Sequence, residues 1–225
     1  MYVKYSILLI VAGVIGLLSC KNNDNVVKPV AFAHLNFVNA STDTLNIYVN
    51  GSRQNNNSSI YPNGQSFYLS VPDGQQNYQF KKAGSPVVLF SIPLTLKDSS
   101  TTSIYVYGAP ASGTITTNDL LFKYSAFPDT TQIRFVNLSP DAGNLDVSIG
   151  DTLSFKSQAF KSSTSFGFTR GGKKDVKIYQ SGSSVPLADT SLTFQRGSIY
   201  TLFSKGLIGG KGNAAFGVGL VINSN

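Results

Sequence analysis

The chain has 225 residues, enough for one or two domains with cores of their own, and carries 18 basic and 11 acidic side chains for a formal net charge of +7. Every acidic residue is Asp, His34 is the one histidine and Cys20 is the one cysteine. This composition excludes a disulfide framework and a thiolate metal site, and it leaves few groups for acid–base catalysis. Charged residues make up 13% of the chain, against ~25% in typical soluble domains, so its polar surface is mainly neutral.

The first element in chain order is a short apolar run, Ile7 to Leu18, which follows the positive charge of Lys4. This layout is typical of a secretory signal, and the run is shorter than the ~20 apolar residues that span a bilayer. It ends in Leu17-Leu18-Ser19-Cys20, which resembles a bacterial lipobox. The resemblance implies that residues 1–19 are a lipoprotein signal peptide, and that Cys20 then carries fatty acids on its thiol and its new amino group.

The next segment, residues 20–31, reads as a short polar tether. A dozen extended residues reach ~40 Å, so the folded part is expected to stay near its membrane. The residue directly after the cysteine is Lys21 and not Asp. In this the sequence resembles lipoproteins that are sorted to the outer membrane. The sequence therefore predicts a protein lipid-anchored in the cell outer membrane, with its periplasmic or surface face left open. This secretory route disfavours nucleic acid as a partner.

The remaining chain contains two copies of one unit. The segment from Leu35 to Asp43 recurs from Ile133 to Asp141, 98 residues further on as counted from Phe37 to Phe135. Downstream, Tyr78 and Phe80 correspond to Val176 and Ile178 in a pattern that alternates apolar and polar positions. Period-two alternation with turn residues every ten or so positions is typical of antiparallel strands that bury one face.

The repeat predicts an all-β fold with two tandem immunoglobulin-like antiparallel β-sandwich domains, each of about seven strands, after the signal peptide. We expect the first domain over residues 32–127 and the second over residues 128–225. The last strand of the first domain is expected near Leu120 to Tyr124.

The run from Phe135 to Ala142, with the strand from Leu145 to Asp151, resembles the opening of the domain of unknown function 4397 family. In the first copy, the strand from Asn46 to Gly51 resembles the same family. Asn39 and Asn137 stand where the family often has His. The resemblance covers nearly the whole mature chain. It implies an exported β-sandwich module, frequent on lipoproteins of the Bacteroidota, without an established activity or cofactor.

Two acidic residues recur at the same place in both copies. Asp43 and Asp141 occupy a Ser-x-Asp turn, in which a carboxylate accepts hydrogen bonds from backbone amides two residues further on. We expect them to hold the turn. Gathering of Asp141, Asn144 and Asp146 around Ca²⁺ is the alternative, disfavoured because the spacing of a calcium loop is absent. No metal and no cofactor is expected.

The sequence offers little for catalysis. A Ser-His-Asp triad would need His34, which alternation places on the outward face of its strand, and no Gly-x-Ser-x-Gly elbow supports one. The glycines from Gly209 to Gly212 lack the spacing of a phosphate-binding loop and predict a hairpin turn. We therefore expect no enzyme and no catalytic residue. A hydrolase that attacks envelope polymers through scattered Asp residues is the alternative.

Two sets of residues are candidates for contact with envelope glycans or other envelope proteins. One is a basic hairpin, expected either to contact anionic glycans or to be a solvated tip; its residues are Arg170, Lys173, Lys174 and Lys177. The other is a set of tyrosines expected to be exposed and able to stack on sugars; these are Tyr48, Tyr68 and Tyr107.

Three threonines follow an Asp and resemble the O-glycan acceptors of exported Bacteroidota proteins; these are Thr44, Thr130 and Thr152. Together the observations predict a non-enzymatic, membrane-anchored cell-envelope lipoprotein that acts as a scaffold, adhesion or glycan-contact module of unknown ligand. A fimbrial-type subunit is the other alternative, besides the hydrolase.

Overall fold

The computed structural model describes residues 31–55, 58–108, 111–119, 121 and 129–224. Residues 31–225 form one compact unit. In the described ranges the regular elements are β-strands and two short 3₁₀ helices, η2 (Ala111–Gly113) and η3 (Gly212–Ala214). None of the helices in these ranges is long and apolar enough to cross a membrane. Cys20, the leader and the tether up to residue 30 lie outside the described residues, so the predicted cleavage and lipidation stay predictions.

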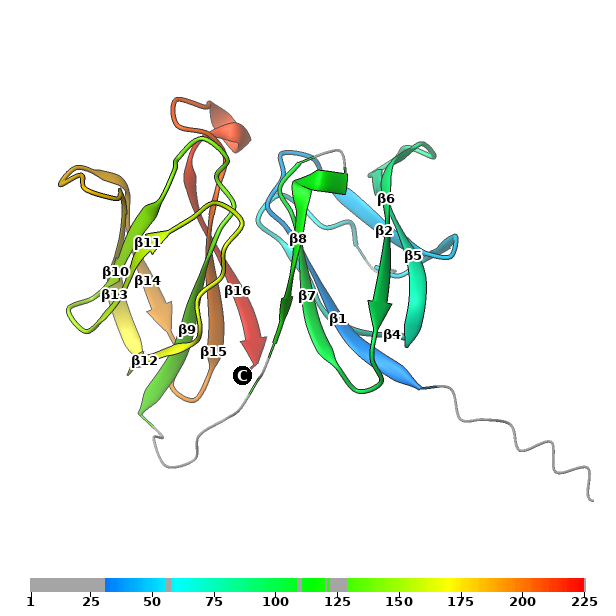
Figure 1. Cartoon of the computed structure of the whole chain (residues 1–225), viewed down its shortest axis with the longest axis horizontal. Helices are drawn as coiled ribbons and strands as arrows, with labels where there is room; N and C mark the ends of the chain where they lie inside the picture. The colour runs from blue at the N-terminus through cyan, green and yellow to red at the C-terminus, as the bar shows by residue number, and fades with distance from the viewer. Residues whose placement is uncertain (1–30, 56–57, 109–110, 120, 122–128, 225) are drawn as a thin grey trace, which may run out of the picture. The chain divides into compact units, whose positions relative to one another are not determined.

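The first eight strands form two four-stranded sheets, the two layers of one sandwich (Figure 1). One sheet has the strand order β4-β1-β7-β8 and the other the order β3-β2-β5-β6. The strands of the first sheet are β1 (Phe32–Asn39), β4 (Gln65–Pro72), β7 (Thr101–Val106) and β8 (Thr114–Asn118). The strands of the second sheet are β2 (Leu45–Val49), β3 (Ser52–Arg53), β5 (Gly74–Lys82) and β6 (Val88–Leu96).

The next eight strands repeat this arrangement in a second sandwich, with sheet orders β12-β9-β15-β16 and β11-β10-β13-β14. The strands of its first sheet are β9 (Thr130–Asn137), β12 (Gly167–Arg170), β15 (Ile199–Lys205) and β16 (Gly217–Ser224). The strands of its second sheet are β10 (Leu145–Ile149), β11 (Leu153–Gln158), β13 (Gly172–Gln180) and β14 (Pro186–Phe194). The prediction of an all-β chain with two tandem sandwiches is confirmed.

Each sandwich contains one parallel strand pair, which the sequence analysis did not anticipate. β1 pairs with β7 in parallel, from His34 with Thr101 to Asn39 with Val106, and β9 pairs with β15 in the same way. Parallel neighbours need a crossover connection. Here the chain between β1 and β7 forms the strands of the facing sheet before it returns. The expected count of about seven antiparallel strands per copy is therefore corrected to eight strands with one parallel pair.

The core of each sandwich comes from the inward positions of both sheets. In the first, Phe37 of β1 meets Tyr78 and Phe80 of β5, with ring centroids 5.9 and 6.0 Å apart. Each side chain of this size contributes ~1.5 to 3 kcal/mol by leaving water. In the second, Val176 and Ile178 of β13 occupy the matching buried positions, since they pair with β10 as Tyr78 and Phe80 pair with β2. The predicted equivalence of the copies is confirmed there.

The outward faces of the sheets that contain β1 and β9 are also covered, because they pack against each other. The apolar part of this contact contains residues from both sandwiches, namely Val38, Ala40, Tyr105, Val136, Leu138, Phe203 and Val221. Tyr105 and Phe203, which are equivalent at the 98-residue offset, contact each other with ring centroids 6.2 Å apart. Contact between equivalent residues is the mark of a two-fold arrangement. The two copies therefore meet through the same surface.

The last strand of the first sandwich lies earlier than expected. β8 covers Thr114–Asn118, and Leu120 to Tyr124, the expected position, lies outside the described residues except for Leu121. The expected position rests on the apolar residues of that segment, whereas the strand is built from β-branched threonines with one apolar residue, Ile115. The expected domain boundary at residue 128 also falls outside the described residues and stays a prediction.

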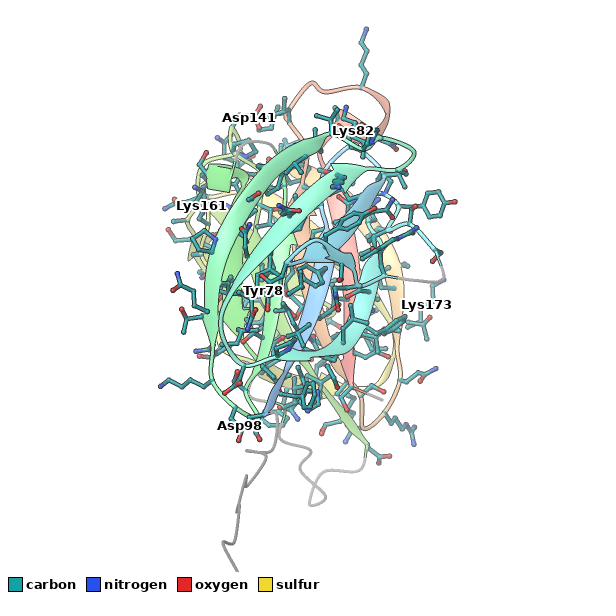
Figure 2. All side chains as sticks on the ribbon, turned by 90° about the vertical axis from the view of Figure 1, so that its right-hand side faces the viewer. Tyr78, Lys82, Asp98, Asp141, Lys161 and Lys173 are labelled. Carbon is teal, nitrogen blue, oxygen red and sulfur yellow. The ribbon has the colours of Figure 1, made fainter. Side chains whose placement is uncertain are left out.

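Tyr78 provides a stability test of the first core. It lies inside the sandwich (Figure 2), and no hydrogen-bond partner is found for its buried hydroxyl among the described residues. Burial raises the pKa of Tyr78 to about 12. Because an unpaired buried hydroxyl is unfavourable, Tyr78→Phe should leave the unfolding free energy unchanged or raise it by ~1 kcal/mol in urea denaturation. Tyr105→Phe, which removes a hydroxyl that accepts from Arg134 at 3.2 Å, is the matched control and should lower it; equal losses in both would contradict this account.

Candidate functional site

The turn that follows β1 is held by the buried side chain of Asn39. Its Nδ2 donates to the backbone carbonyls of Asp43 at 2.7 Å and Ile60 at 2.8 Å. Its Oδ1 accepts from the backbone N–H of Ser41 at 3.1 Å and from the Ser41 hydroxyl at 2.7 Å. The amide thus uses two donors and two acceptor positions, its full capacity. Asn39 therefore fixes the path from β1 into β2.

Asn137 does the same after β9. Its Nδ2 donates to the backbone carbonyls of Gly143 at 3.0 Å and Gln158 at 2.9 Å. Its Oδ1 accepts from the Ser139 N–H at 3.1 Å and from the hydroxyl of Ser204 on β15 at 2.9 Å. The two asparagines are the residues that stand where the family often has His, and their role here is to hold the turn.

The aspartates of the repeated turn bind groups outside it. The Asp43 carboxylate pairs with the Lys82 ammonium at 2.9 Å, and both side chains are half exposed. The two carboxylate oxygens of Asp141 accept from the backbone N–H of Ile208 at 3.1 and 3.0 Å, and one lies 3.4 Å from the Ser139 hydroxyl. Both carboxylates therefore connect their turn to a neighbouring hairpin.

A cavity of about 230 Å³ lies where turns of the two sandwiches meet. The first sandwich supplies the turn from Ala40 to Asp43 and the end of β7, and the second supplies Pro140 and part of the connection between β15 and β16. Much of the lining is apolar, with Leu45, Leu89, Phe90, Leu138 and Leu207 among its residues. Pockets for drug-sized ligands measure ~300 to 1,000 Å³, so this cavity fits a single ring or side chain.

The cavity also has polar groups in its lining. They come from Ser41, whose hydroxyl is bound to Asn39, and from Thr42, Asp43, Tyr107 and Asn213. The Tyr107 hydroxyl donates to the carbonyl of Ser112 at 2.6 Å, and Asp43 is paired with Lys82 as described above. Within the described residues, no hydrogen bond is found for the Thr42 hydroxyl or for the side-chain amide of Asn213. The cavity thus has an apolar lining with two free, neutral hydrogen-bonding groups.

The cavity is at the end of the first sandwich that is opposite to the start of β1. The tether joins the chain just before Phe32, and the eight residues of β1 rise ~25 Å before the turn at Ala40. Ser99 donates to the Phe32 carbonyl at 2.8 Å, so Asp98 marks the tether end of the sandwich. Lys82 and Asp98 lie at opposite ends of it in Figure 2.

A buried ion pair lies in the contact between the two sandwiches. Arg134 of β9 pairs with Asp119, which follows β8, and both side chains are at most 3% exposed. The guanidinium also donates to the hydroxyls of Thr117 at 2.9 Å, Tyr105 at 3.2 Å and Thr201 at 2.9 Å. Burial by itself lowers the pKa of Arg134, but Tyr105 and the negative charge of Asp119 raise it by more, so the net pKa shift is upward.

Asp119 is equally well bound. It accepts from the hydroxyls of Ser103 at 2.5 Å, Tyr68 at 2.6 Å and Thr117 at 3.0 Å. Tyr68 in turn accepts from the amide of Asn223, on β16 of the second sandwich, at 2.9 Å. Burial and the charge of Asp119 raise the pKa of Tyr68. The network therefore connects the two sandwiches across their contact, and its two charges, on Arg134 and Asp119, are paired.

The predicted basic hairpin has a mixed charge in the structure. Lys173, Lys174 and Lys177 of β13 line one shallow hollow together with Asp151 and Asp175. Lys177 pairs with Asp189 at 3.4 Å, and this bond raises the pKa of Lys177. The fourth predicted residue, Arg170, ends β12 and is exposed outside that lining. Because carboxylates lie among the lysines, the hollow offers less to a polyanion than the sequence alone indicates.

The residues of the disfavoured calcium alternative are bound to other groups. Asp146 accepts from the Ser157 N–H at 2.8 Å, the Ser181 hydroxyl at 2.7 Å and Lys156 at 3.3 Å, and these hydrogen bonds lower its pKa. Asn144 donates to the Ser157 hydroxyl. In the described ranges, no group of three or more His, Cys, Asp or Glu side chains is placed to hold a metal ion.

The three tyrosines expected to be exposed are all half-buried, which corrects that expectation. Tyr48 lies under the Lys81 ammonium at 4.3 Å from the ring centroid. Tyr68 belongs to the buried network, and Tyr107 packs edge-on against Phe160 at 5.4 Å. Each ring is partly covered, either by a neighbouring side chain or by the contact with the other sandwich.

The predicted O-glycan acceptors differ in accessibility. Thr44 and Thr130 are half-buried at the edges of β2 and β9. Thr152 is exposed in the turn between β10 and β11, with its hydroxyl oxygen 2.8 Å from that of Thr169. Glycosylation stays a prediction for all three.

His34 is exposed on β1, as its alternation predicts, and Gly209 to Gly212 lie in the connection between β15 and β16, as a hairpin turn requires. Arg134 and Asp119 were not predicted from the sequence, and neither were Thr42 and Asn213 as lining residues. One signal was present: Ile104-Tyr105-Val106 and Leu202-Phe203 are unbroken apolar runs, typical of strands that are buried on both faces.

The comparisons with known proteins agree with the two-copy architecture. The family described as "domain of unknown function (DUF4397)" matches residues 33–148 and again residues 131–216. The first match begins in β1 and continues into β9 and β10, and the second begins in β9. No curated protein matches the sequence.

Two solved structures are similar to the chain at low identity. A carbohydrate-binding module, CBMbc of family CBM26 from Eubacterium rectale Amy13K in complex with maltoheptaose, is 11% identical with a TM-score of 0.28, over 82% of this chain and 95% of that one. A leucine-rich repeat protein from Bacteroides thetaiotaomicron VPI-5482 is 14% identical with a TM-score of 0.19, over 80% of this chain and 26% of that one. Because the family matches cover both sandwiches, this chain belongs to the DUF4397 family.

Proposed function

We propose that this protein is a non-enzymatic module of the cell envelope, lipid-anchored in the outer membrane through Cys20, that contacts envelope glycans with the end remote from its anchor. The anchoring half of the proposal rests on the lipobox-like Leu17-Leu18-Ser19-Cys20 and on Lys21 directly after it. Several acyl chains on one residue make such an anchor effectively permanent, at ~0.8 kcal/mol per buried methylene.

The observation that carries the binding half is the cavity. It lies beyond the end of β1 that is opposite to Phe32, the residue that follows the predicted tether, which favours its exposure away from an anchor at Cys20. Its walls come from both sandwiches, and two neutral hydrogen-bonding groups in it are free. Concave sites with an apolar lining and a few polar groups are where small ligands bind.

The carboxylates support a binding role over hydrolysis. Hydrolysis by acid and base needs two carboxyl groups that both reach one substrate bond. Here Asp119 is buried in an ion pair, Asp141 accepts a backbone N–H and Asp146 accepts three hydrogen bonds. Each of these groups already has a structural partner, which favours a module that binds without reacting.

The proposal is tested on natively expressed protein with two readouts. Mass spectrometry of the mature N-terminus should find an acylated Cys20, and Cys20→Ser should lose the acyl label and accumulate the uncut precursor. An array of envelope glycans, probed with the soluble chain from Lys21 onward, should retain the protein on at least one glycan class. This chain is suitable because residues 31–225 form a compact unit. An intact Met1 with no acylation would overturn the anchor, and an empty array would overturn the glycan contact.

A further inference from the structure

Resting on the proposed function, we infer that the cavity between the two sandwiches binds one neutral pyranose unit of a glycan, with Thr42 and Asn213 as its hydrogen-bonding residues. Thr42 comes from the β1–β2 turn of the first sandwich, and Asn213 comes from η3 in the second. The ligand is thus held from both copies at once.

Size selects a single ring. The cavity measures about 230 Å³, which is below the volume range for drug-sized ligands and too small for several linked sugars. Its lining includes the turn after β1 and the connection after β15, so the ligand enters between two turns. A terminal or branching sugar of a longer glycan meets this requirement, because the rest of the chain can remain outside.

Charge selects a neutral ligand. The one carboxylate of the lining, Asp43, is neutralised by Lys82 at 2.9 Å. The remaining polar groups that lack partners, the Thr42 hydroxyl and the Asn213 amide, are uncharged and offer both donors and acceptors. An anionic or cationic ligand finds no free opposite charge in this lining. Vicinal sugar hydroxyls, which both donate and accept, match such groups.

The apolar lining selects a ligand with an apolar face. Phe90, Leu138 and Leu207 surround the same space that Thr42 and Asn213 reach. A pyranose presents C–H groups on one face and hydroxyls at its edge, so it satisfies both parts of the lining. A purely apolar side chain from a partner protein would fill the space but would make no hydrogen bond with Thr42 or Asn213, whereas the hydroxyls of a sugar can bond to both.

The test is an ¹H–¹⁵N NMR titration of the soluble chain from Lys21 onward with methyl glycosides of glucose, mannose, galactose and N-acetylglucosamine. At least one glycoside should give saturable shifts confined to the amides of the cavity lining, including Thr42, Gly108 and Asn213. Thr42→Ala combined with Asn213→Ala should weaken binding about tenfold or more, since two hydrogen bonds are lost. Asn144→Ala, an exposed asparagine outside the lining, is the matched control and should bind as the unaltered chain does.

The outcomes separate this inference from the proposed function. If no glycoside shifts the cavity amides while the glycan array still retains the double variant, the cavity inference is overturned and the glycan contact stands elsewhere. If N-acetyl-leucine methyl ester shifts these amides and the glycosides do not, the occupant is an apolar side chain and the inference is again overturned. An array that retains neither protein overturns the glycan function itself.

Discussion

Replacing Arg134 with alanine should lower the free energy of unfolding by about 3 to 5 kcal/mol. The reason is the charge that remains: Asp119 is at most 3% exposed, and without its partner it is a buried, uncompensated carboxylate. The hydroxyls of Tyr105, Thr117 and Thr201 lose a charged donor at the same time. Urea denaturation followed by circular dichroism and by tyrosine fluorescence measures the loss.

The chain supplies its own control for this experiment. Arg196 pairs with Asp129 at 2.8 Å, but both side chains are 69% exposed. Exposed pairs contribute ~0 to 1 kcal/mol because water and salt screen them, so Arg196→Ala should change little. If Arg134→Ala and Arg196→Ala gave similar losses, the buried network would not be what holds the two sandwiches together.

A double replacement separates the charge from the packing. Arg134→Met together with Asp119→Leu removes both charges and fills the space with apolar atoms, a change that is often neutral or stabilising for a buried pair. We expect it to recover most of the loss seen in Arg134→Ala. If the double variant binds the methyl glycosides with unchanged affinity, apolar contact alone orients the cavity walls. Loss of this binding would show that the network sets the orientation.

The network also distinguishes two nearly equivalent surfaces. At the 98-residue offset the residue that matches Arg134 is Asn36, and the strand register makes Asn223 the match of Asp119. The contact is therefore two-fold in its apolar residues but carries its ion pair on one side only. A single buried charged pair in an otherwise symmetric contact specifies which surface meets which. This favours docking of the first copy onto the second within one chain.

Alternation was sufficient to predict the cores. Phe37, Tyr78 and Phe80 in the first copy, and Phe135, Val176 and Ile178 in the second, are buried as their period-two pattern indicates. The pattern is reliable here because each strand faces a sheet on one side, and a shift by one residue would expose the whole apolar set. The two-copy organisation follows from the repeat itself, which needs no structural information.

Alternation could not predict what covers the other face. It places Tyr68, Tyr105 and Arg134 on outward positions, and nothing local indicates that a second sandwich lies there. The parallel pairs were missed for a similar reason, because β1 and β7 are separated by more than sixty residues and meet only through the fold. Contacts between distant segments depend on topology, whereas a periodic pattern reports only on one strand.

The role of the turn was assigned to the wrong side chains. Asp43 and Asp141 were expected to bind amides of their own turn, and both instead bind neighbouring segments. Asn39 and Asn137 make the hydrogen bonds that hold the turn. Each lies at the end of a central strand just before the turn, where its buried side chain reaches two segments at once. A neutral amide can both donate and accept, which a carboxylate at that position cannot.

Asn137→Ala should therefore lower the free energy of unfolding by about 2 to 4 kcal/mol, since it removes four hydrogen bonds from a side chain with no exposed surface. Asn137→Asp is the sharper variant. It preserves the shape and the acceptor oxygen, but it replaces the donor that serves the carbonyls of Gly143 and Gln158 with a second oxygen. A buried carboxylate against two carbonyls is unfavourable, so this variant should lose at least as much as the alanine variant.

Asn144→Ala provides the matched control, because Asn144 is exposed and makes a single side-chain bond, to Ser157. It should change the unfolding free energy by less than ~0.5 kcal/mol in the same urea titration. If Asn137→Asp were as stable as the unaltered chain, the two carbonyls would not need the amide donor. The turn of the second copy would then be held by its backbone alone. The cavity wall at Leu138 and Pro140 would not depend on the side chain of Asn137.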